Sequence, residues 1–447
     1  MTISASASTP DITDVPEGFP VGTVEPSYLL TQSLDPDPAG VFGNLSSEDR
    51  SYRDRARAFV QDEVLPVIAG HWERGEYPLH LLKRLGELDL LRDGLQVEGF
   101  APMSTMAAGL VNMEISRGDG SMGTVVAVQG GLALRSVAMC GSEEQKRRLL
   151  TPMACGDEYG AFALTEPTHG SDSVALETTA VATAGGFLLN GEKKWIGNGS
   201  VGGTTVVWAR AEDGQVHGYL VPQDSPGYCA TTIQGKSSLR AIWQAHIRLE
   251  NVFVPAENVL PGANSFKDTT RVLLATRLGV AWSAVGHATA CYETAVQYAA
   301  QRVQFGRPLA ASQIVQERLA RMLSELATMQ LIVVQMTRLE ESGNLTPMQA
   351  SLAKYTCTRT ARSIAANARD LLGGNGILLT NRVARHMADI EAIHTYEGTE
   401  TVQALIIGRS ITGISAFNRS GTSSRLHLPI AGPSSVAFLK GQTHELR

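Results

Sequence analysis

The apolar residues of this 447-residue chain change their spacing twice along its length. Over residues 46–157 they recur every three or four residues, which is typical of amphipathic helices. Over residues 158–265, short β-branched runs such as 204–209 alternate with Asn-Gly and Gly-Gly turns, which predicts antiparallel strands. Helical spacing returns over residues 266–417. A chain with this order of patterns is expected to be an α+β multidomain protein.

The pattern also predicts where the domains begin and end. The apolar stripes of the last helical block repeat every 3.5 residues, which favours near-antiparallel helix packing. Both ends of the chain are rich in Ser, Thr, Gly and Pro and show little periodicity. We therefore expect an N-terminal extension (1–45), a helical N-terminal domain (46–157), a central antiparallel β domain (158–265), a C-terminal four-helix bundle (266–417) and a tail (418–447).

Charge and cysteine usage exclude several classes of protein. The 38 Lys and Arg residues against 44 Asp and Glu give a net charge of −6, which offers no electrostatic basis for binding nucleic acid or an anionic membrane. No apolar run reaches the roughly 18 residues that a membrane helix needs. The five scattered cysteines form no Cys-x-x-Cys pair, which indicates a reducing compartment. The first basic residue is Arg50, so no signal or transit peptide is predicted, and we expect a cytoplasmic enzyme.

Three common catalytic patterns are excluded. Residues 197–202 fit the dinucleotide pattern G-x-G-x-x-G, but a strand-like run follows them where the pyrophosphate would need a helix N-terminus. The ten histidines form no metal-binding pair beside cysteines or acids, so no metal site is predicted. There is no G-x-S-x-G nucleophile elbow.

Four polar segments remain: 162–172, 194–198, 302–313 and 394–399, the last preceded by the glycine-rich 371–376. Taken singly, each has an ordinary structural interpretation. Trp195 alone would more often belong to a core, Arg302 to a surface salt bridge, and Glu397 to a solvated helix end. Their order on a helix, strand, helix plan is what favours a functional interpretation.

In this order the segments resemble the acyl-CoA dehydrogenase and acyl-CoA oxidase superfamily of flavoproteins, over about residues 46–417. The stretches 260–268, 346–351 and 411–417 are similar to those of its glutaryl-CoA dehydrogenase members and of the plant short-chain acyl-CoA oxidase. The resemblance implies the acyl-CoA dehydrogenase fold, an FAD cofactor, an acyl-CoA substrate and a role in fatty acid metabolism. It also implies a homo-oligomer, usually a tetramer, with electron-transfer flavoprotein or O₂ as the electron acceptor.

The resemblance places FAD between the β domain and the bundle of a neighbouring subunit. Thr165 and Ser171 would donate hydrogen bonds to the cofactor, and Trp195 would pack against the flavin ring. The ADP half would contact the bundle. The full set of implied cofactor residues is Phe162, Leu164, Thr165, Gly170, Ser171, Trp195, Ile196, Gly197, Arg302, Gln304, Phe305, Gln313, Asp370, Leu371, Gly373, Gly374, Thr399 and Glu400.

By the same resemblance, Glu397 in Tyr-Glu-Gly-Thr matches the catalytic base. A carboxylate suits this role because the α-proton of a thioester is a very weak acid, and desolvation in a closed site raises the carboxyl pKa toward the working range. The thioester carbonyl would be polarised by the backbone N–H of Glu397 and a flavin ribityl hydroxyl. The implied substrate contacts are Gly123, Thr124, Ser171, Arg277 and Gly398.

Two positions depart from the family pattern. Glutaryl-CoA dehydrogenase members hold the distal carboxylate of their substrate with Arg followed by Ser, where this chain has Gly123 and Thr124. Since a buried carboxylate without a partner costs several kcal/mol, a short uncharged acyl chain is predicted. Dehydrogenases generally carry Thr or Ser where this chain has Gly197, whereas the plant oxidase has Gly. We expect Gly197 to leave space beside the flavin and to permit measurable reaction with oxygen.

The resemblance thus implies FAD-dependent α,β-dehydrogenation of an acyl-CoA to the trans-2-enoyl-CoA, with hydride transfer to flavin N5, and the departure at Gly123 favours a short uncharged acyl chain. Three alternatives stay open at this point. The first is a short-chain oxidase that reduces O₂ to H₂O₂. The second is a biosynthetic dehydrogenase that acts on a carrier-protein thioester, and the third is a binding module without catalysis.

Overall fold

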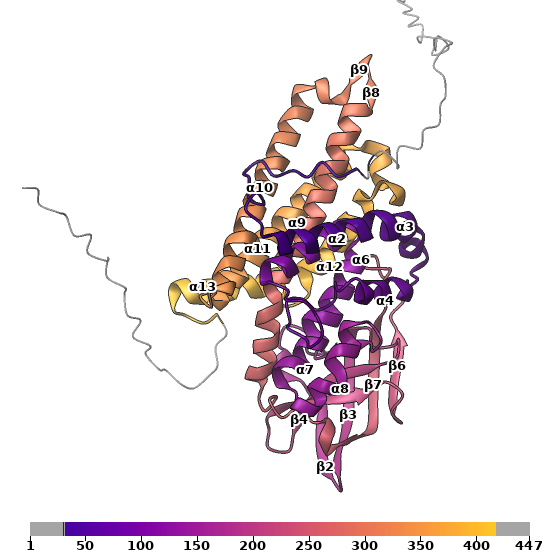
Figure 1. The fold of residues 1–447 in the computed structure, drawn as a ribbon, viewed down its shortest axis with the longest axis vertical. Coiled ribbons are helices and arrows are strands. Elements are labelled where there is room, and N and C mark those ends of the chain that lie inside the picture. Colours follow the sequence, from indigo (N-terminus) through magenta and orange to yellow (C-terminus); the bar gives the residue numbers. More distant parts are fainter. Residues whose placement is uncertain (1–29, 31, 417–447) are drawn as a thin grey trace, which may run out of the picture.

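The computed structural model of the protein describes residue 30 and residues 32–416, and all structural statements below concern this part of the chain. The predicted tail and most of the predicted extension lie outside the described residues. Figure 1 shows a helical bundle at one end of the molecule, the β domain at the other, and the N-terminal helices between them. The expected α+β architecture is confirmed.

The N-terminal domain is a series of short helices, two pairs of which are joined by π-helical turns. Ser46 caps the first helix, accepting from the N–H of Asp49, whose carboxylate accepts from the N–H of Ser46, as a capping box predicts. A π-helical turn at Val60–Val64 joins α2 to α3, and another at Ala127–Leu134 joins α6 to α7. The helices are α2 (Ser47–Phe59), α3 (Leu65–Arg74), α4 (Leu79–Glu87), α5 (Thr105–Gly118), α6 (Gly120–Val126), α7 (Arg135–Cys140) and α8 (Glu143–Ala154).

Part of this domain, which was predicted to be helical, is a loop. Residues 88–104 contain no helix, because the backbone at Asp89, Asp93, Gly94 and Gly99 has positive φ. The loop is held from inside by Arg92, whose fully buried guanidinium donates to the Asp89 carboxylate at 2.6 and 2.8 Å. The loop fixes Asp93 next to the candidate site described below.

The β domain is a seven-stranded sheet that is mostly antiparallel. β4 departs from the expected pattern, because β1 and β2 both pair with it in parallel. The long pair β3 and β7 forms the centre of the antiparallel part, and β2 and β3 form a hairpin whose turn needs Gly185 at a φ of +79°. The strands are β1 (Gly160–Ala163), β2 (Thr179–Thr183), β3 (Gly186–Gly197), β4 (Thr204–Ala211), β5 (Val216–Pro222), β6 (Tyr228–Thr232) and β7 (Gln244–Pro255).

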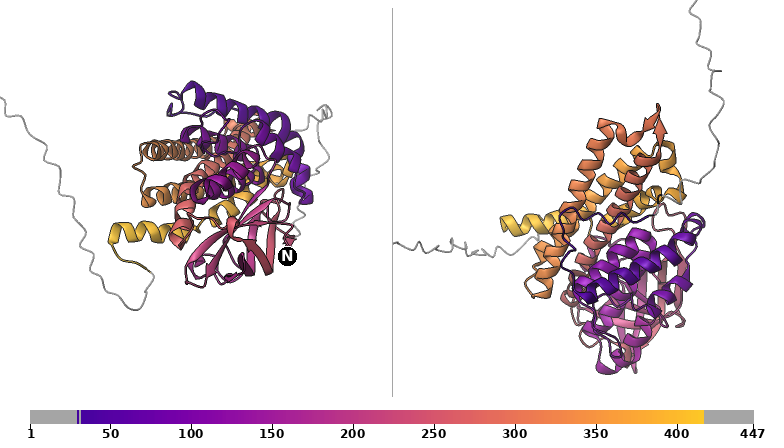
Figure 2. Two further views of the ribbon diagram at one scale, coloured as in Figure 1. Left: turned by 60° about the horizontal axis from the view of Figure 1, so that its bottom comes forward. Right: turned by 45° about the horizontal axis from the view of Figure 1, so that its top comes forward.

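The C-terminal domain is a bundle built on the 36-residue helix α9. Short, small side chains such as Ala281, Ala288 and Ala295 are fully buried along α9 and allow its neighbours to approach closely. A fifth helix, α13, packs against α11 and projects from the body of the molecule in both views of Figure 2. The elements are α9 (Phe266–Gln301), a hairpin of β8 (Val303–Gln304) and β9 (Arg307–Pro308), α10 (Gln313–Glu341), α11 (Pro347–Leu371), α12 (Val383–Thr395) and α13 (Glu400–Thr412).

The described part of the N-terminal extension has no helix or strand, yet it is packed onto the bundle. Leu30 is buried in the bundle core, and the N–H of Leu34 donates to the buried Glu293 carboxylate of α9 at 2.8 Å. Gln330 of α10 donates to the carbonyl of Pro36 at 2.8 Å. These contacts tie the segment to two helices of the C-terminal domain.

A single helical stretch, Gly120–Cys140, is long and apolar enough to cross a membrane by length and composition alone, within residues 30 and 32–416. Of its apolar window, 67% is buried inside the protein. Core helices of water-soluble proteins pass the same test, so this stretch is weak support for a membrane span. The expectation that nothing spans a membrane stays a prediction.

Candidate active site

Glu397 lies in the tight turn between α12 and α13. Its φ is 52°, a left-handed conformation that a residue with a Cβ atom adopts at a cost on the order of 1 kcal/mol. Gly398 continues the turn at a φ of +85°. Backbone strain of this kind persists only where neighbouring groups hold it in place.

Two buried side chains hold the turn. Lys354 of α11 is fully buried and donates to the carbonyl of Gly398 at 2.6 Å and also to that of Tyr396. Gln403 of α13, also fully buried, donates to the carbonyls of Glu397 and Gly398 at 3.0 Å each. Burial lowers the pKa of Lys354 to about 7, against the opposing effect of the Glu397 charge. The backbone on both sides of Glu397 is thereby fixed.

The Glu397 side chain is half-buried and faces α9. The hydroxyl of Thr276 donates to Glu397 Oε2 at 2.8 Å. Burial raises the pKa of the Glu397 carboxyl, while the charges of Lys354 and Arg277 and the Thr276 hydrogen bond act in the opposite direction. A carboxyl with a raised pKa in a cleft is suited to accept a proton near neutral pH.

The hydrogen bond from Thr276 provides a direct test of this electrostatic balance. Because the bond favours the ionised carboxylate, Thr276→Val should raise the pKa of Glu397, and the acid limb of the rate against pH should move to higher pH. The measurement is flavin reduction at a series of pH values. Thr269→Val, the same change at a fully buried position on α9, serves as the control. An acid limb that does not move would show that Thr276 leaves the ionisation of Glu397 unchanged.

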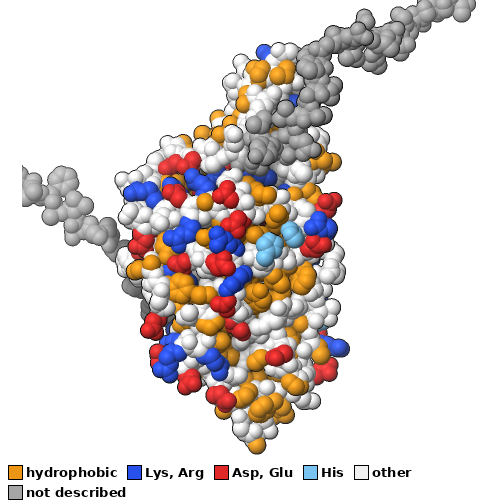
Figure 3. All heavy atoms as spheres, turned by 45° about the vertical axis from the view of Figure 1, so that its right-hand side comes forward, with side chains coloured by type: hydrophobic (Ala, Val, Ile, Leu, Met, Phe, Trp, Pro, Cys, Tyr) orange, Lys and Arg blue, Asp and Glu red, His pale blue; other side chains and the backbone are white. Residues whose placement is uncertain are grey.

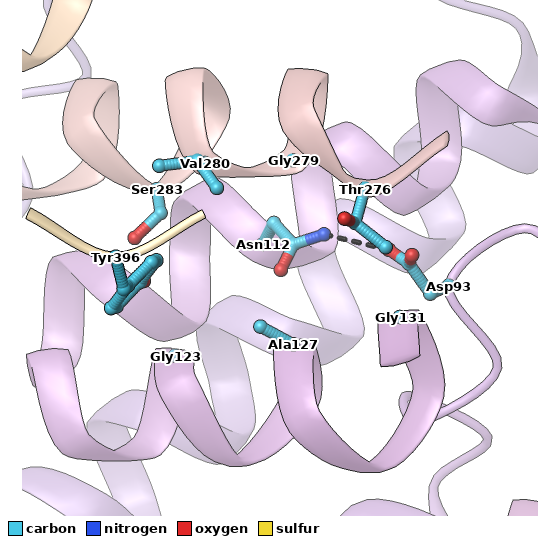
Figure 4. A pocket seen from close by; sticks show the side chains of 10 residues that line it. All are labelled: Asp93, Asn112, Gly123, Ala127, Gly131, Thr276, Gly279, Val280, Ser283 and Tyr396. Carbon is cyan, nitrogen blue, oxygen red and sulfur yellow. Dashed lines mark hydrogen bonds between the residues drawn. The ribbon is translucent and has the colours of Figure 1, made fainter. Parts of the chain in front are cut away.

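A small cavity opens beside this turn (Figure 4). Thr276 and Tyr396 line it, so it lies directly next to the Glu397 carboxylate. No Lys or Arg is among its lining residues in the described chain. The residues that line it come from the loop after α4, from α5, α6, the π-helical turn, α9 and the Glu397 turn: Asp93, Asn112, Gly123, Ala127, Gly131, Thr276, Gly279, Val280, Ser283 and Tyr396.

Of the residues predicted to contact the substrate, only Gly123 lines the cavity. Gly123 lines the cavity, and a Cβ atom there would lie 2.1 Å from Ser116 Oγ, so no side chain fits without a shift. Thr124 is buried behind it and donates to the carbonyl of Gly120 at 2.9 Å. Arg277 bonds to Ser351 at 3.1 Å, and its buried Nε has no hydrogen-bond partner among the described residues. Ser171 and Gly398 lie outside the cavity lining.

One group of predicted cofactor residues gathers at the end of the β domain that faces the cavity. Phe162, Leu164 and Ile196 are buried, whereas Trp195 is 55% exposed. The backbone of Thr165 is fixed by a hydrogen bond, because its carbonyl accepts from the N–H of Lys194 at 2.8 Å. The buried Lys193 ammonium donates to the Leu164 carbonyl at 3.0 Å, which further fixes this strand end. Gly170 and Ser171 are exposed in the loop that follows.

A second group lies at the far end of the bundle, at the β8–β9 hairpin (Figure 1). Arg302, Gln304, Phe305 and Gln313 are exposed there, and Asp370 joins them through an ion pair with Arg318 at 2.5 Å. Leu371 is buried, while Gly373 and Gly374 are exposed. Thr399 and Glu400 lie apart from this hairpin, directly after the Glu397 turn, where Thr399 caps α13 and Glu400 pairs with Arg359 at 2.6 Å. One chain therefore does not bring the two groups together, as expected if they belong to different subunits.

Both groups have features that suit a large planar cofactor. Trp195 and Phe305 present exposed aromatic rings, and exposed hydrophobic side chains show at the hairpin end in Figure 3. A Cβ atom at Gly170, Gly373 or Gly374 would meet nothing within 4 Å, so the backbone there is open to a ligand. The hydroxyls of Thr165 and Ser171 have no partner within the described chain. The donor set fits a phosphate-bearing aromatic group.

The space expected beside Gly197 is already filled. A Cβ atom at Gly197 would lie 2.8 Å from Cγ2 of Val128, in the π-helical turn between α6 and α7. Val128 is itself buried, and its neighbours Ala127 and Gly131 line the cavity. The expectation that Gly197 leaves an open edge is therefore wrong, because Val128 takes up the volume that a Thr side chain would use.

Sequence patterns did not identify several residues that shape this site. Lys354 lies on the buried face of α11, in register with Ser351, Cys357 and Ala361, and a charged residue in such a stripe is a signal that could have found it. Thr276 directly precedes the predicted Arg277. Asp93 precedes Gly94, and this Asp-Gly pair predicts only a turn, not a functional residue. Asn112 lies in no pattern that would have identified it.

The chain is similar to known proteins over most of its length. The family models for the acyl-CoA dehydrogenase N-terminal, middle and C-terminal domains match residues 46–157, 161–252 and 266–412. The mitochondrial short-chain specific acyl-CoA dehydrogenase of Rattus norvegicus is 33% identical over 362 residues, which cover 79% of this chain and 88% of the rat protein.

Two solved structures are similar over most of the chain. The glutaryl-CoA dehydrogenase of Mycobacterium smegmatis is 42% identical, with a TM-score of 0.83, and the match covers 85% of this chain and 98% of that one. A glutaryl-CoA dehydrogenase of the same organism in complex with FADH₂ is 37% identical, with a TM-score of 0.82, over 84% of this chain and 97% of the other.

Proposed function

Because the chain belongs to the acyl-CoA dehydrogenase family of FAD-dependent oxidoreductases that act on CH–CH bonds, we propose that it dehydrogenates a short, uncharged acyl-CoA to the trans-2-enoyl-CoA. The observation that carries this proposal is the half-buried Glu397 carboxylate, held in a strained turn at the edge of the cavity. Small residues such as Gly123, Ala127 and Gly131 line this cavity, which suits a short acyl chain.

Glu397 accepts the α-proton of the thioester. Lys354 and Gln403 fix the backbone of its turn, so that the carboxylate stays aimed at the cavity without reorganisation during the reaction. Thr276 keeps the carboxylate ionised enough to act as a base although burial raises its pKa. The balance suits proton transfer near neutral pH.

The backbone N–H of Glu397 polarises the thioester carbonyl. This N–H donates to no other group within the described chain, so it is available to a carbonyl oxygen on which negative charge develops. Bound FAD supplies the acceptor for the hydride that leaves the β-carbon. Phe162, Thr165, Ser171 and Trp195 would hold its flavin end.

The ADP half of the cofactor would contact Arg302, Phe305, Gln313 and the segment 370–374 of a second copy of the chain. The separation of the two groups within one chain supports a homo-oligomer, which we propose is a tetramer. We further propose electron-transfer flavoprotein as the electron acceptor and the cytoplasm as the location.

Oxygen as the acceptor is the second candidate, and Gly197 favours it because it lacks the hydroxyl with which Thr or Ser would donate a hydrogen bond to flavin N5. We expect substrate-reduced enzyme to react measurably with oxygen. Since Val128 obstructs a larger residue at Gly197, the informative variant is Gly197→Thr with Val128→Ala. Stopped-flow mixing with aerated buffer should show slower reoxidation in the double variant than in Val128→Ala alone, with a smaller effect on flavin reduction. Equal oxygen reactivity would mean that Gly197 only accommodates Val128.

The proposed reaction itself is tested by anaerobic reduction of the bound flavin with a panel of short acyl-CoA thioesters. Oxidised FAD is yellow, so its loss of colour follows the reaction directly. Reduction by butyryl-CoA supports the proposal, and no reduction by any acyl thioester contradicts it.

A further inference from the structure

A few polar side chains interrupt the otherwise small and apolar lining of the cavity next to Glu397. Asn112, Ser283 and Asp93 line it, together with small residues such as Ala127 and Gly131. Asn112 and Ser283 are 4% and 6% exposed, so each belongs to the protein interior. A buried polar group that meets only methylene groups costs free energy, because it loses its hydrogen bonds to water.

The hydrogen bonds of Asn112 fix the orientation of its amide. Both N–H groups face acceptors, the Asp93 carboxylate at 2.9 Å and the Ala108 carbonyl at 3.3 Å. The amide oxygen must therefore point the other way, and Figure 4 shows it directed toward Ala127 across the cavity. No group of the described chain donates to this oxygen. It is an acceptor presented to whatever occupies the cavity.

Ser283 presents a complementary donor. Its oxygen accepts a hydrogen bond from Ser116 at 2.8 Å, which leaves its own O–H without an acceptor in the described chain. In Figure 4 the hydroxyl points toward Tyr396 and thus into the cavity. A group that both donates to Asn112 and accepts from Ser283 would satisfy both residues.

Asp93 adds further hydrogen-bond acceptors, the oxygens of its carboxylate, to the part of the cavity that Asn112 lines. Its carboxylate accepts from Asn112 and from Arg135, each at 2.9 Å, and Asp93 lines both this cavity and an adjoining one. Arg135 and Glu340 lie on the far side of Asp93 in the adjoining cavity. Since the Asp93 charge is paired with Arg135, the site does not require a cationic substrate.

We propose that the acyl group of the physiological substrate carries a hydroxyl beyond its β-carbon, bound between the Asn112 oxygen and the Ser283 hydroxyl. A hydroxyl is the smallest uncharged group that donates one hydrogen bond and accepts another. This hydroxyl must lie beyond the β-carbon, because the α-carbon has to face Glu397, which takes its proton, and the β-carbon has to face the flavin, which takes its hydride. The inference rests on the proposed dehydrogenation and names the class of acyl chain that this site selects.

The experiment compares 4-hydroxybutyryl-CoA with butyryl-CoA, and 5-hydroxypentanoyl-CoA with pentanoyl-CoA, as substrates of the FAD-loaded enzyme. A site built to bind a hydroxyl discriminates against the analogue that lacks it. We expect kcat/KM for at least one hydroxyacyl substrate to exceed that of its alkyl partner by about tenfold or more. Ser283→Ala and, independently, Asn112→Leu should lower this ratio about fivefold or more, the scale of one hydrogen bond.

Ser116→Ala is the matched control, because it removes the same Ser116–Ser283 hydrogen bond from the side that does not line the cavity. It should keep the wild-type ratio. Alkyl substrates that match or exceed both hydroxyacyl substrates would overturn the inference, and so would a ratio that neither pocket variant changes. Both results would leave the dehydrogenation itself intact, whereas failure of every acyl thioester to reduce the flavin would instead overturn the proposed function.

Discussion

Glu397→Gln is expected to keep FAD bound and to lower the rate of flavin reduction by at least about a hundredfold, the usual scale for loss of a general base. Glutamine has nearly the shape of glutamate and can still accept from Thr276, so the turn held by Lys354 and Gln403 should persist. What it loses is the capacity to take up the α-proton. The measurement is anaerobic stopped-flow mixing of the variant with butyryl-CoA.

Glu391→Gln provides the control for this substitution. Glu391 lies on α12, six residues before Glu397, and its side chain is 53% exposed, where it pairs with Arg362. This control should reduce its flavin as fast as the wild type. If Glu397→Gln also reduced at the wild-type rate, the base would be another residue and the assigned role of Glu397 would be wrong.

The second large effect concerns the charge of the acyl group. We expect butyryl-CoA to exceed glutaryl-CoA by at least about a hundredfold in kcat/KM, because a buried carboxylate without a partner costs several kcal/mol. Neither Lys nor Arg lines the cavity in the described chain, the position of Gly123 has no room for a side chain, and Asp93 adds a negative charge. Arg135 in the adjoining cavity is already paired with Asp93 at 2.9 Å.

The methyl ester of glutaryl-CoA separates charge from length, because it is at least as long as glutaryl-CoA and carries no carboxylate. It should react faster than glutaryl-CoA itself. Asp93→Asn should narrow the margin between butyryl- and glutaryl-CoA, since it removes a like charge and releases Arg135. Efficient turnover of glutaryl-CoA by the wild type, with release of CO₂, would show that some cation does reach the substrate carboxylate.

The family and the arrangement of helix, strand and helix could be predicted because they depend on local signals. The capping box at Ser46 and the hairpin glycine Gly185 act within a few residues of themselves, and the structure shows both. The parallel pairing of β4 with β1 and β2 joins segments that are far apart in sequence. No periodicity within a strand reports on the direction of its neighbour, so this pairing was not predicted.

The same limit applies within the site. Glu397 stands in a recognisable motif, but the residues that orient it, Lys354 and Thr276, reach it across 43 and 121 positions of sequence. The contact between Gly197 and Val128 is another long-range packing event, and it reversed the expectation of an open flavin edge. The hydroxyl-binding end of the cavity depends on the direction of the Asn112 amide, which only its hydrogen-bond partners determine.

The most direct test of the whole account is the absorbance spectrum of the purified protein during anaerobic titration with short acyl-CoA thioesters. The protein should be yellow, release FAD on denaturation, and lose the absorbance of oxidised flavin when a short uncharged or hydroxylated acyl-CoA is added. Glutaryl-CoA should have little effect under the same conditions. A protein that binds FAD but keeps its oxidised spectrum with every acyl thioester would contradict the proposed dehydrogenation.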